Sequence, residues 1–332
     1  MLLGPRQVGK TTLLKEIRSD LSITLLERKV RLAYEKDPDR LSTEIAGLTR
    51  PKGSRKPLVI IDEIQKVPVL LDVIQKQIDD KKAQFILTGS SARKLRRQEE
   101  VNLLPGRVVQ LRLAPLTLLE MKNAKLDPLL LYGALPGVFL TEKPTDKDLD
   151  LETYVETYLE EEVRSEALVR KIGEFAKFLE LAGLESGKIL NSSKIANDLG
   201  VSAKTVASYF EILEDCLIAE RVDPISKSQT RHKLTKSSRY LIFDLGVRRL
   251  CSNEGTKLGP SRLGELFEQW VGLELIYQGR LLSPRARLKF WRDPDGPEVD
   301  WVIDNDGYYT PLEVKCTDRP ASSDIRHIEV FL

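Results

Sequence analysis

Residues 4–12 read Gly4-Pro5-Arg6-Gln7-Val8-Gly9-Lys10-Thr11-Thr12, and the first eight fit the phosphate-loop pattern G-x-x-x-x-G-K-[ST] in full. Glycines in such a loop let main-chain N–H groups wrap the phosphates of a nucleotide. We expect Lys10 to reach the β and γ phosphates of ATP and the Thr11 hydroxyl to bind Mg²⁺. A helix-forming run, Thr12 to Ser19, follows the loop. The alternative is a glycine-rich turn that matches by chance.

A second motif argues against that alternative. Residues 58–63 read Leu-Val-Ile-Ile-Asp62-Glu63, a continuous apolar run that ends in two acids. Such a run is typical of a parallel strand buried on both faces. We expect Asp62 to hold the magnesium and Glu63 to polarise the attacking water. The other interpretation, that the two acids only cap the next helix, is disfavoured by the spacing of about 50 residues from Lys10.

A third apolar run, beginning at Phe85, ends in the hydroxyl residues Thr88, Ser90 and Ser91. In a doubly wound sheet this strand is expected to lie beside the first two, with its end at the γ phosphate. One of these hydroxyls is therefore a candidate nucleotide sensor, and we take Ser90 as a candidate catalytic residue. Ser90 as a simple helix cap is an equally good interpretation.

Positive charge follows the third strand. Arg93, Lys94, Arg96 and Arg97 come first, and Arg107 follows in Leu-Pro-Gly-Arg. An arginine presented to the γ phosphate of a neighbouring subunit would stabilise the transition state of phosphoryl transfer. Arg107 is the first candidate and Arg96 the second, and ordinary solvated charge is the alternative for each.

Bulk composition restricts the remaining choices. The 332 residues are enough for two or three domains, and 52 Lys and Arg against 50 Asp and Glu give no global argument for nucleic acid or membrane binding. Three separated cysteines and two histidines disfavour a disulfide framework or a zinc site and fit the cytoplasm. No apolar run approaches the ~20 residues of a membrane helix, and no signal peptide precedes the loop. Because only three residues stand before Gly4, we expect the lead-in strand to be missing. The chain stops at Leu332, directly after an expected strand, so we also expect the C-terminal domain to be truncated.

The middle of the chain predicts helices and then a DNA-binding element. Apolar residues recur at helical spacing from Leu151 to Leu184. Residues 192–213 then predict a helix, a turn at Gly200, a Ser202 cap and a second helix. The exposed positions of that helix are Lys204, Thr205 and Ser208, and a basic wing follows with Lys227, Arg231, His232, Lys233, Lys236 and Arg239. Winged helices also serve as protein-packing modules, which is the alternative interpretation.

The C-terminal segment predicts a nuclease-like site. Asp300 lies in an apolar strand, Glu313 and Lys315 lie in a second strand, and Glu268 lies on a helix. Two acids at neighbouring strand ends hold magnesium in D…E-x-K nucleases, and the lysine orients the water. We therefore take Asp300 and Glu313 as metal ligands, with Glu268 as an outer one. Nearby positive charge, at Arg285, Arg287, Lys289 and Arg292, suits a phosphate backbone or is ordinary surface.

The wording of these motifs resembles one family. GPRQVGKTTLL, IIDEIQKVP, ILTGSSARKL and PGRVVQLRLAPLTLLE are similar to the bacterial and archaeal AAA-type ATPases whose C-terminal half combines a helix-turn-helix segment with a restriction-endonuclease-like domain. NSSKIANDLGVSAKTVASYFEILEDCLI, RYLIFDLGVRRL, GELFEQWV, PEVDWVI and LEVK extend the resemblance over nearly the whole chain. The resemblance implies an α/β P-loop NTPase parallel sheet with helices on both faces. It also implies a homo-oligomeric ring, such as a hexamer.

We expect four segments on this basis: an ATPase core at 1–125, a helical connector at 126–184, a winged helix-turn-helix at 185–255 and a small α/β restriction-endonuclease-like domain at 260–332. Three functions then compete. The first is an ATP-hydrolysing motor that remodels or translocates duplex or branched DNA and uses the nuclease-like domain for binding. The second is an ATP-dependent switch without translocation, and the third is an ATP-gated endonuclease.

Overall fold

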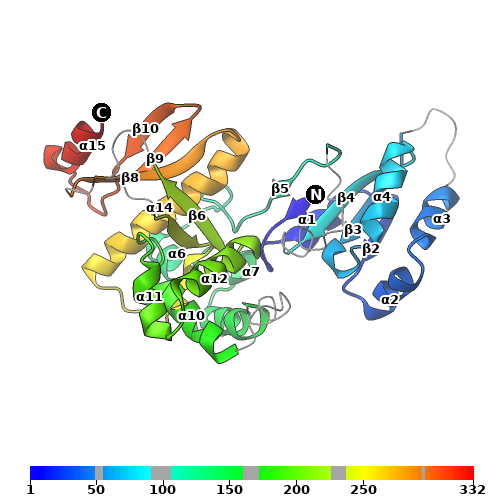
Figure 1. Ribbon diagram of the computed structural model, residues 1–332, viewed down its shortest axis with the longest axis horizontal. Coiled ribbons are helices and arrows are strands. Elements are labelled where there is room, and N and C mark those ends of the chain that lie inside the picture. Colours follow the sequence, from blue (N-terminus) through cyan, green and yellow to red (C-terminus); the bar gives the residue numbers. More distant parts are fainter. Residues whose placement is uncertain (49–54, 91–105, 160–171, 226–236, 294–295) are drawn as a thin grey trace. The chain divides into compact units, whose positions relative to one another are not determined.

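The computed structural model describes residues 1–48, 55–90, 106–159, 172–225, 237–293 and 296–332 (Figure 1). The chain separates into two compact units, Met1–Ala114 with Asp215–Leu217, and Pro115–Glu214 with Ile218–Leu332. Among the described residues, no helix has the length and apolar character that a membrane crossing needs. Several candidates of the sequence analysis lie outside the described residues: Ser91, Arg93, Lys94, Arg96, Arg97, Lys227, Arg231, His232, Lys233 and Lys236.

A five-stranded parallel sheet forms the centre of the first unit, as expected. Its order is β2-β3-β4-β1-β5, with β1 Leu2–Leu3, β2 Leu21–Thr24, β3 Leu58–Asp62, β4 Gln84–Gly89 and β5 Leu111–Arg112. Helices α1 Lys10–Lys15, α2 Arg28–Lys36, α3 Arg40–Gly47 and α4 Leu70–Asp79 flank it, together with the short 3₁₀ helix η1 Ile64–Lys66 (Figure 1).

Strand β4 lies between β1 and β3. Leu2 is paired with Thr88, and Ile61 is paired with Leu87, both in parallel register. The predicted neighbourhood of the three strands is therefore confirmed. Strand β3 is buried on both faces, because Val59, Ile60 and Ile61 are each at most 2% exposed. The carboxyl ends of β1, β3 and β4 thus meet at one edge of the sheet.

Two expectations about the phosphate loop's surroundings were wrong. The lead-in strand that seemed to be missing is present as the two-residue strand β1. The helix after the loop begins at Lys10 and ends at Lys15, not at Ser19. It ends early because the N–H groups of Glu16 and Ile17 bond to carbonyls three residues back, which tightens the last turn.

The second unit contains helices and a mixed five-stranded sheet. Its helices are α6 Leu126–Tyr132, α7 Pro136–Leu140, α8 Pro144–Thr153, the π-helix η2 Tyr154–Leu159, α10 Ile172–Leu184, α11 Ser192–Leu199, α12 Ala203–Asp215, α13 Leu245–Cys251, α14 Pro260–Leu282, the 3₁₀ helix η3 Ser322–Ile325 and α15 Arg326–Phe331. The sheet has the order β10-β9-β8-β6-β7. Its strands are β6 Ala219–Pro224, β7 Arg239–Ile242, β8 Arg287–Arg292, β9 Glu298–Asn305 and β10 Tyr308–Leu312.

This sheet joins two stretches of sequence that were predicted to form separate domains. Strands β6 and β7 form the antiparallel hairpin of the expected wing, and β8 to β10 belong to the expected nuclease-like segment. Strand β6 pairs in parallel with β8 through Asp223 opposite Lys289 and Pro224 opposite Phe290. Residues of both stretches therefore share one continuous sheet.

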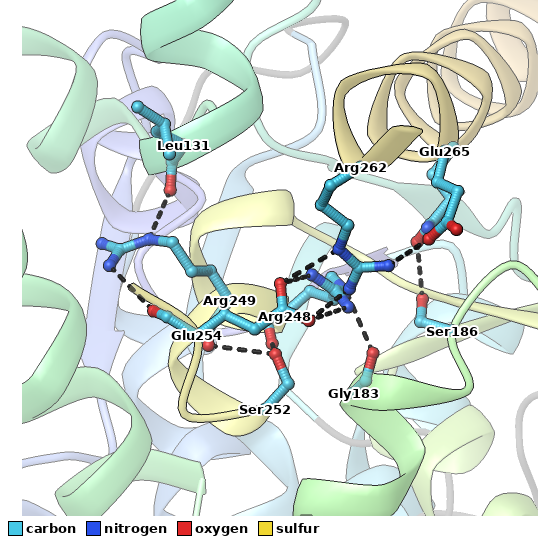
Figure 2. Close-up of polar contacts among 10 residues, drawn as sticks. Leu131, Gly183, Ser186, Arg248, Arg249, Ser252, Glu254, Arg262 and Glu265 are labelled. Atoms are coloured by element: carbon cyan, nitrogen blue, oxygen red, sulfur yellow. Dashed lines mark hydrogen bonds and ion pairs between the residues drawn. The ribbon is translucent and has the colours of Figure 1, made fainter. Parts of the chain in front are cut away.

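Buried arginines of α13 connect several helices of the second unit (Figure 2). Arg248 is fully buried, and its Nε donates to the carbonyl of Gly183 at 2.9 Å. Its two terminal nitrogens donate to the carboxylate of Glu254 at 2.5 and 2.9 Å. Arg249 donates to the carbonyl of Leu131 at 2.8 Å. Because a buried guanidinium is costly unless its donors are satisfied, this network fixes α13 against α6 and α10.

Candidate nucleotide site and a second acidic site

The phosphate loop connects β1 to α1 and depends on its two glycines. Gly9 has φ of +93°, in the left-handed region that glycine adopts freely. A Cβ on Gly4 would lie 2.4 Å from the carbonyl oxygen of Leu113, so only glycine fits there. The ammonium of Lys10, 6% exposed, donates to the carbonyls of Gly4 and Pro5, both at 2.7 Å. The loop thus holds a buried positive charge beside main-chain N–H groups, as a phosphate cradle requires.

Asp62 is positioned by two hydroxyls at the end of β3. Its Oδ2 accepts a hydrogen bond from Thr11 at 3.1 Å, and its Oδ1 accepts a short one from Thr88. Thr88, which is fully buried, also accepts the main-chain N–H of Glu63 at 3.0 Å. The ends of β3 and β4 and the first turn of α1 are therefore connected through side chains, with Asp62 at the centre.

The Thr11 hydroxyl and the Asp62 carboxylate offer adjacent oxygen ligands, the type that Mg²⁺ prefers. These two residues fit a magnesium ion that arrives with a nucleotide. When bound, such an ion would neutralise charge on the phosphates and hold them in position.

Glu63 has an unusual backbone and a constrained side chain. Its φ of +61° and ψ of +48° place a non-glycine residue in the left-handed region, a costly conformation that clusters at functional sites. Its Oε2 accepts a short hydrogen bond from Gln65 Nε2 and a longer one, 3.4 Å, from Ser90 Oγ. Ser90 also accepts from Gln65 Nε2 at 3.1 Å. Of the two candidate hydroxyls that the structure describes, Thr88 and Ser90, it is Ser90 that contacts the Glu63 carboxylate.

The second acidic site lies in the C-terminal sheet. The antiparallel pairing of β10 with β9 ends with Leu312 opposite Trp301. One residue further along, Glu313 therefore lies next to Asp300 of β9. Lys315 Nζ donates to Glu313 Oε1 at 2.6 Å. The three residues of the predicted D…E-x-K arrangement are therefore neighbours. However, Glu313 and Lys315 follow β10 and are not part of it, because Asp300 Oδ2, and not a main-chain carbonyl, accepts the Val314 N–H at 2.8 Å.

The side chains of this acidic site shift one another's pKa. Burial raises the pKa of Asp300, the Val314 N–H lowers it, and the charge of Glu313 raises it again. Burial lowers the pKa of Lys315, but the hydrogen bond to Glu313 and the charges of Glu313 and Asp300 raise it overall. Glu313 Oε2 is buried and accepts no hydrogen bond from the described residues. That oxygen fits a cation, although no group of three His, Cys, Asp or Glu placed to hold a metal occurs in the described ranges.

Arg239 belongs to this site and not to the surface of a wing. It is 4% exposed, lies over the rings of Phe290 and Trp301, and donates to Glu268 Oε1 at 2.8 Å. Burial raises the pKa of Glu268 to about 7, the charge of Asp300 adds to this effect, and Arg239 opposes it. The expected role of Glu268 as an outer metal ligand therefore competes with its ion pair.

Comparison with known protein families divides the chain into three parts. Residues 1–122 match the model of the AAA domain. The chain carries an AAA-type, P-loop ATPase-like domain at its N-terminus. Residues 123–257 match a domain of unknown function (DUF8612), and residues 263–332 match another (DUF4143). These descriptions name neither a winged helix nor a restriction-endonuclease-like domain, so both stay predictions.

Similar proteins occur in bacteria of two genera, Mycobacterium and Haemophilus. Uncharacterized proteins of Mycobacterium bovis and Mycobacterium tuberculosis are each 26% identical over 329 residues, which cover 97% of this chain and 71% of the relative. An uncharacterized protein of Haemophilus influenzae is 24% identical over 308 residues, covering 84% and 74%. A solved DNA clamp loader delta protein of Bacillus subtilis is 14% identical and covers 82% of this chain and 94% of that one, with a TM-score of 0.27. That value is too low to support an argument.

Arg107, the first candidate for an arginine offered to a neighbour, lies in the ATPase-like domain. Its side chain is 36% exposed, and its Nε donates to Asp79 Oδ1 at 2.5 Å. Asp79 ends α4 of the same domain. A role in a neighbouring site would require this partly exposed ion pair to open, which costs little at a surface.

The expected helix-turn-helix segment contains its two helices, α11 and α12. Gly200, with φ of +67°, ends the first in the left-handed region, and Ser202 Oγ accepts the Thr205 N–H at 3.1 Å to cap the second. Lys204 is exposed, whereas Thr205 and Ser208 are partly exposed. All three lie in the first half of α12.

Two residues of these sites, Gln65 and Arg239, were missed as members. Gln65 follows the acidic pair by two positions in a short 3₁₀ helix and is 7% exposed. A polar residue two positions after the acidic pair, in a largely apolar stretch, is the signal that points to it. Arg239 opens the apolar run Tyr240-Leu241-Ile242, a sign that it begins a buried strand and not a solvated wing.

Proposed function

We propose that this protein is an ATP-hydrolysing machine that binds and remodels DNA, with hydrolysis at the site formed by Lys10, Thr11, Asp62 and Glu63. The observation that carries the proposal is the convergence of the loop lysine, the Asp62 carboxylate and the Glu63 carboxylate at one edge of a parallel sheet. ATP and Mg²⁺ are the cofactors that such a site requires.

Each residue then has a separate task. Main-chain N–H groups and the Lys10 ammonium bind the phosphates and balance their charge. Thr11 and Asp62 would supply oxygen ligands to a magnesium ion. Glu63 accepts the proton of the attacking water, for which its carboxylate is held near the end of β4. Arg107 supplies positive charge to a neighbouring subunit's γ phosphate, so the active form is a homo-oligomeric ring, such as a hexamer.

DNA binding rests on the second unit. The N-terminal turn of a recognition helix is the part that contacts bases in a helix-turn-helix. In α12 that turn carries Lys204 and Thr205, and the acidic residues Glu211 and Glu214 lie toward the other end. The lysine of α12 therefore lies at the end that would enter the groove, and its acids lie at the other end. We propose a cytoplasmic protein in which the restriction-endonuclease-like segment adds contacts with the DNA backbone.

The experiment is ATP turnover with duplex, single-stranded and four-way-junction DNA at two salt concentrations, with Glu63→Gln as the hydrolysis-deficient control. We expect at least one DNA to raise turnover, and the effect to weaken steeply at higher salt because phosphate contacts release counterions. Lys204→Glu should reduce the stimulation without lowering basal turnover. Turnover indifferent to every DNA would contradict DNA remodelling and favour an ATP-dependent switch.

An ATP-gated endonuclease is a second candidate, because Glu313 Oε2, beside Asp300 and Lys315, is a buried oxygen that accepts no hydrogen bond from the residues that the structure describes. Nicking of supercoiled plasmid with magnesium that ATP stimulates, that is lost in Lys315→Ala and that no longer responds to ATP in Lys10→Ala, would support it. The absence of nicking by the wild-type protein would leave this site with binding alone. Arg285, Lys289 and Arg292 already pair with acids of β9 or of the turn that follows it, at 4.0, 2.9 and 3.4 Å.

A further inference from the structure

Gln65 is a buried residue of the nucleotide site that is not among the predicted catalytic residues. It lies in η1, directly after the left-handed turn at Glu63, and is 7% exposed. Its Nε2 donates to Glu63 Oε2 and to Ser90 Oγ. Because an ionised carboxylate can only accept hydrogen bonds, the amide atom that faces Glu63 must be the nitrogen. The orientation of the amide group is therefore fixed by its partner.

The other end of this amide has no partner. Gln65 Oε1 is buried and receives no hydrogen bond within the described part of the chain. A buried acceptor without a donor costs free energy, and such groups call for an explanation. Gly89 leaves room for it, because a Cβ there would lie 2.9 Å from Gln65 Oε1. The Gly89 carbonyl also accepts the N–H of Gly4, so the amide oxygen lies where β4 meets the phosphate loop.

A buried orphan oxygen does not by itself mark a site in this domain. Gln77 in α4, 3% exposed, donates to Ser42 at 2.9 Å and also has an Oε1 without a donor. What distinguishes Gln65 is that its nitrogen donates to the carboxylate of Glu63, the expected base. The nitrogen and oxygen of an amide are bonded to the same carbon atom, so they lie close together. An acceptor oxygen therefore lies next to the carboxylate that receives the proton.

A water molecule that attacks phosphorus carries two hydrogens and is best oriented when each has an acceptor. We propose that Gln65 is a catalytic residue of this site: its amide nitrogen fixes the Glu63 carboxylate, and its amide oxygen accepts the second hydrogen of the attacking water. The inference rests on the proposed ATP hydrolysis.

In that step the water oxygen forms a bond to the γ phosphorus. The bond from that phosphorus to the β,γ-bridging oxygen breaks, and its electron pair leaves with ADP. One proton of the water passes to Glu63, and the other hydrogen stays on the new phosphate after its hydrogen bond to Gln65 has oriented it.

The test compares Gln65→Met with Gln77→Met, its matched control, in the full chain. Both changes remove a buried amide that donates a hydrogen bond and carries an orphan oxygen, so we expect each to lower the melting temperature, Gln65→Met by more because its nitrogen donates to a carboxylate. Turnover is therefore compared at a temperature below both transitions. We expect Gln65→Met to lower kcat about 100-fold, the lower range for a positioned acid–base group, and to leave ATP affinity unchanged. Gln77→Met should turn over ATP like the wild type. Gly89→Ala should lower kcat as well, because its Cβ presses on the Gln65 amide.

Two results would overturn the inference. Gln65→Met could turn over ATP as fast as Gln77→Met, or it could lose ATP affinity in parallel with kcat, which would indicate a structural role. Glu63→Gln separates the two claims. If Glu63→Gln abolishes turnover and Gln65→Met does not, only the role of Gln65 fails. If Glu63→Gln turns over ATP normally, the proposed hydrolysis site fails with it.

Discussion

Replacing Thr88 by valine removes one hydroxyl from the centre of the nucleotide site with almost no change of shape. Thr88 is fully buried, accepts the Glu63 N–H at 3.0 Å and donates to Asp62 Oδ1. Loss of the acceptor leaves a buried N–H unpaired, at about 1–3 kcal/mol, and loss of the donor removes a hydrogen bond to a charged group, at about 1.5–3 kcal/mol. We expect Thr88→Val to lower the free energy of unfolding of the ATPase-like domain by about 3 kcal/mol or more.

Calorimetry of the full chain measures this effect. The transition of the ATPase-like domain is the one that ATP shifts upward, since a ligand stabilises the domain that binds it. Thr88→Val should lower that transition by roughly 10 °C. Thr43→Val, the same change on an exposed threonine of α3, is the control and should stay within about 0.5 kcal/mol of the wild type. If Thr88→Val melts like Thr43→Val, the hydroxyl does not hold Asp62 and Glu63 in the way described.

Two further predictions concern the second unit. Arg248→Met should lower the stability of the second unit by about 3 kcal/mol in thermal unfolding, because Glu254 loses two charge-assisted hydrogen bonds. The double change with Glu254→Gln should cost less than the sum of the two single changes, and additive effects would contradict the Arg248–Glu254 ion pair. Burial raises the pKa of Asp244 from 3.8 to about 6, so this carboxyl stabilises the fold below its unfolded pKa and the contribution is lost as pH rises through about 6. The melting temperature of the wild type relative to Asp244→Asn should therefore fall across that window, by an equivalent of at most about 3 kcal/mol, and a constant difference would refute the shift.

The strands of the ATPase-like domain could be predicted because parallel strands buried on both faces are continuous apolar runs. Residues 58–61 and 85–87 carry that pattern, and the motif spacing indicates which strand ends meet. The left-handed turn at Glu63 could not be predicted, because nothing local requires it. It follows from the Thr88 hydroxyl, which captures the Glu63 N–H from a different strand.

Predictions in the second unit failed where tertiary contacts replaced local rules. Arg239 was assigned to a solvated wing on charge alone, but two aromatic rings and the Glu268 carboxylate stabilise it in the interior. Glu313 was placed inside a strand, but the Asp300 side chain takes the N–H of Val314 that would continue the ladder. Both signals depend on residues about 14 to 60 positions away, which no window of sequence contains.

Binding of ATP with Mg²⁺ to the wild-type chain and to Lys10→Ala, measured by isothermal titration calorimetry, tests the central claim most directly. The buried Lys10 ammonium donates to the carbonyls of Gly4 and Pro5, and alanine removes its positive charge. We expect saturable binding by the wild type and a loss of at least about 1.5–3 kcal/mol, the contribution of a hydrogen bond to a charged group, in Lys10→Ala. Equal affinity of the two proteins, or no binding by either, would contradict the account.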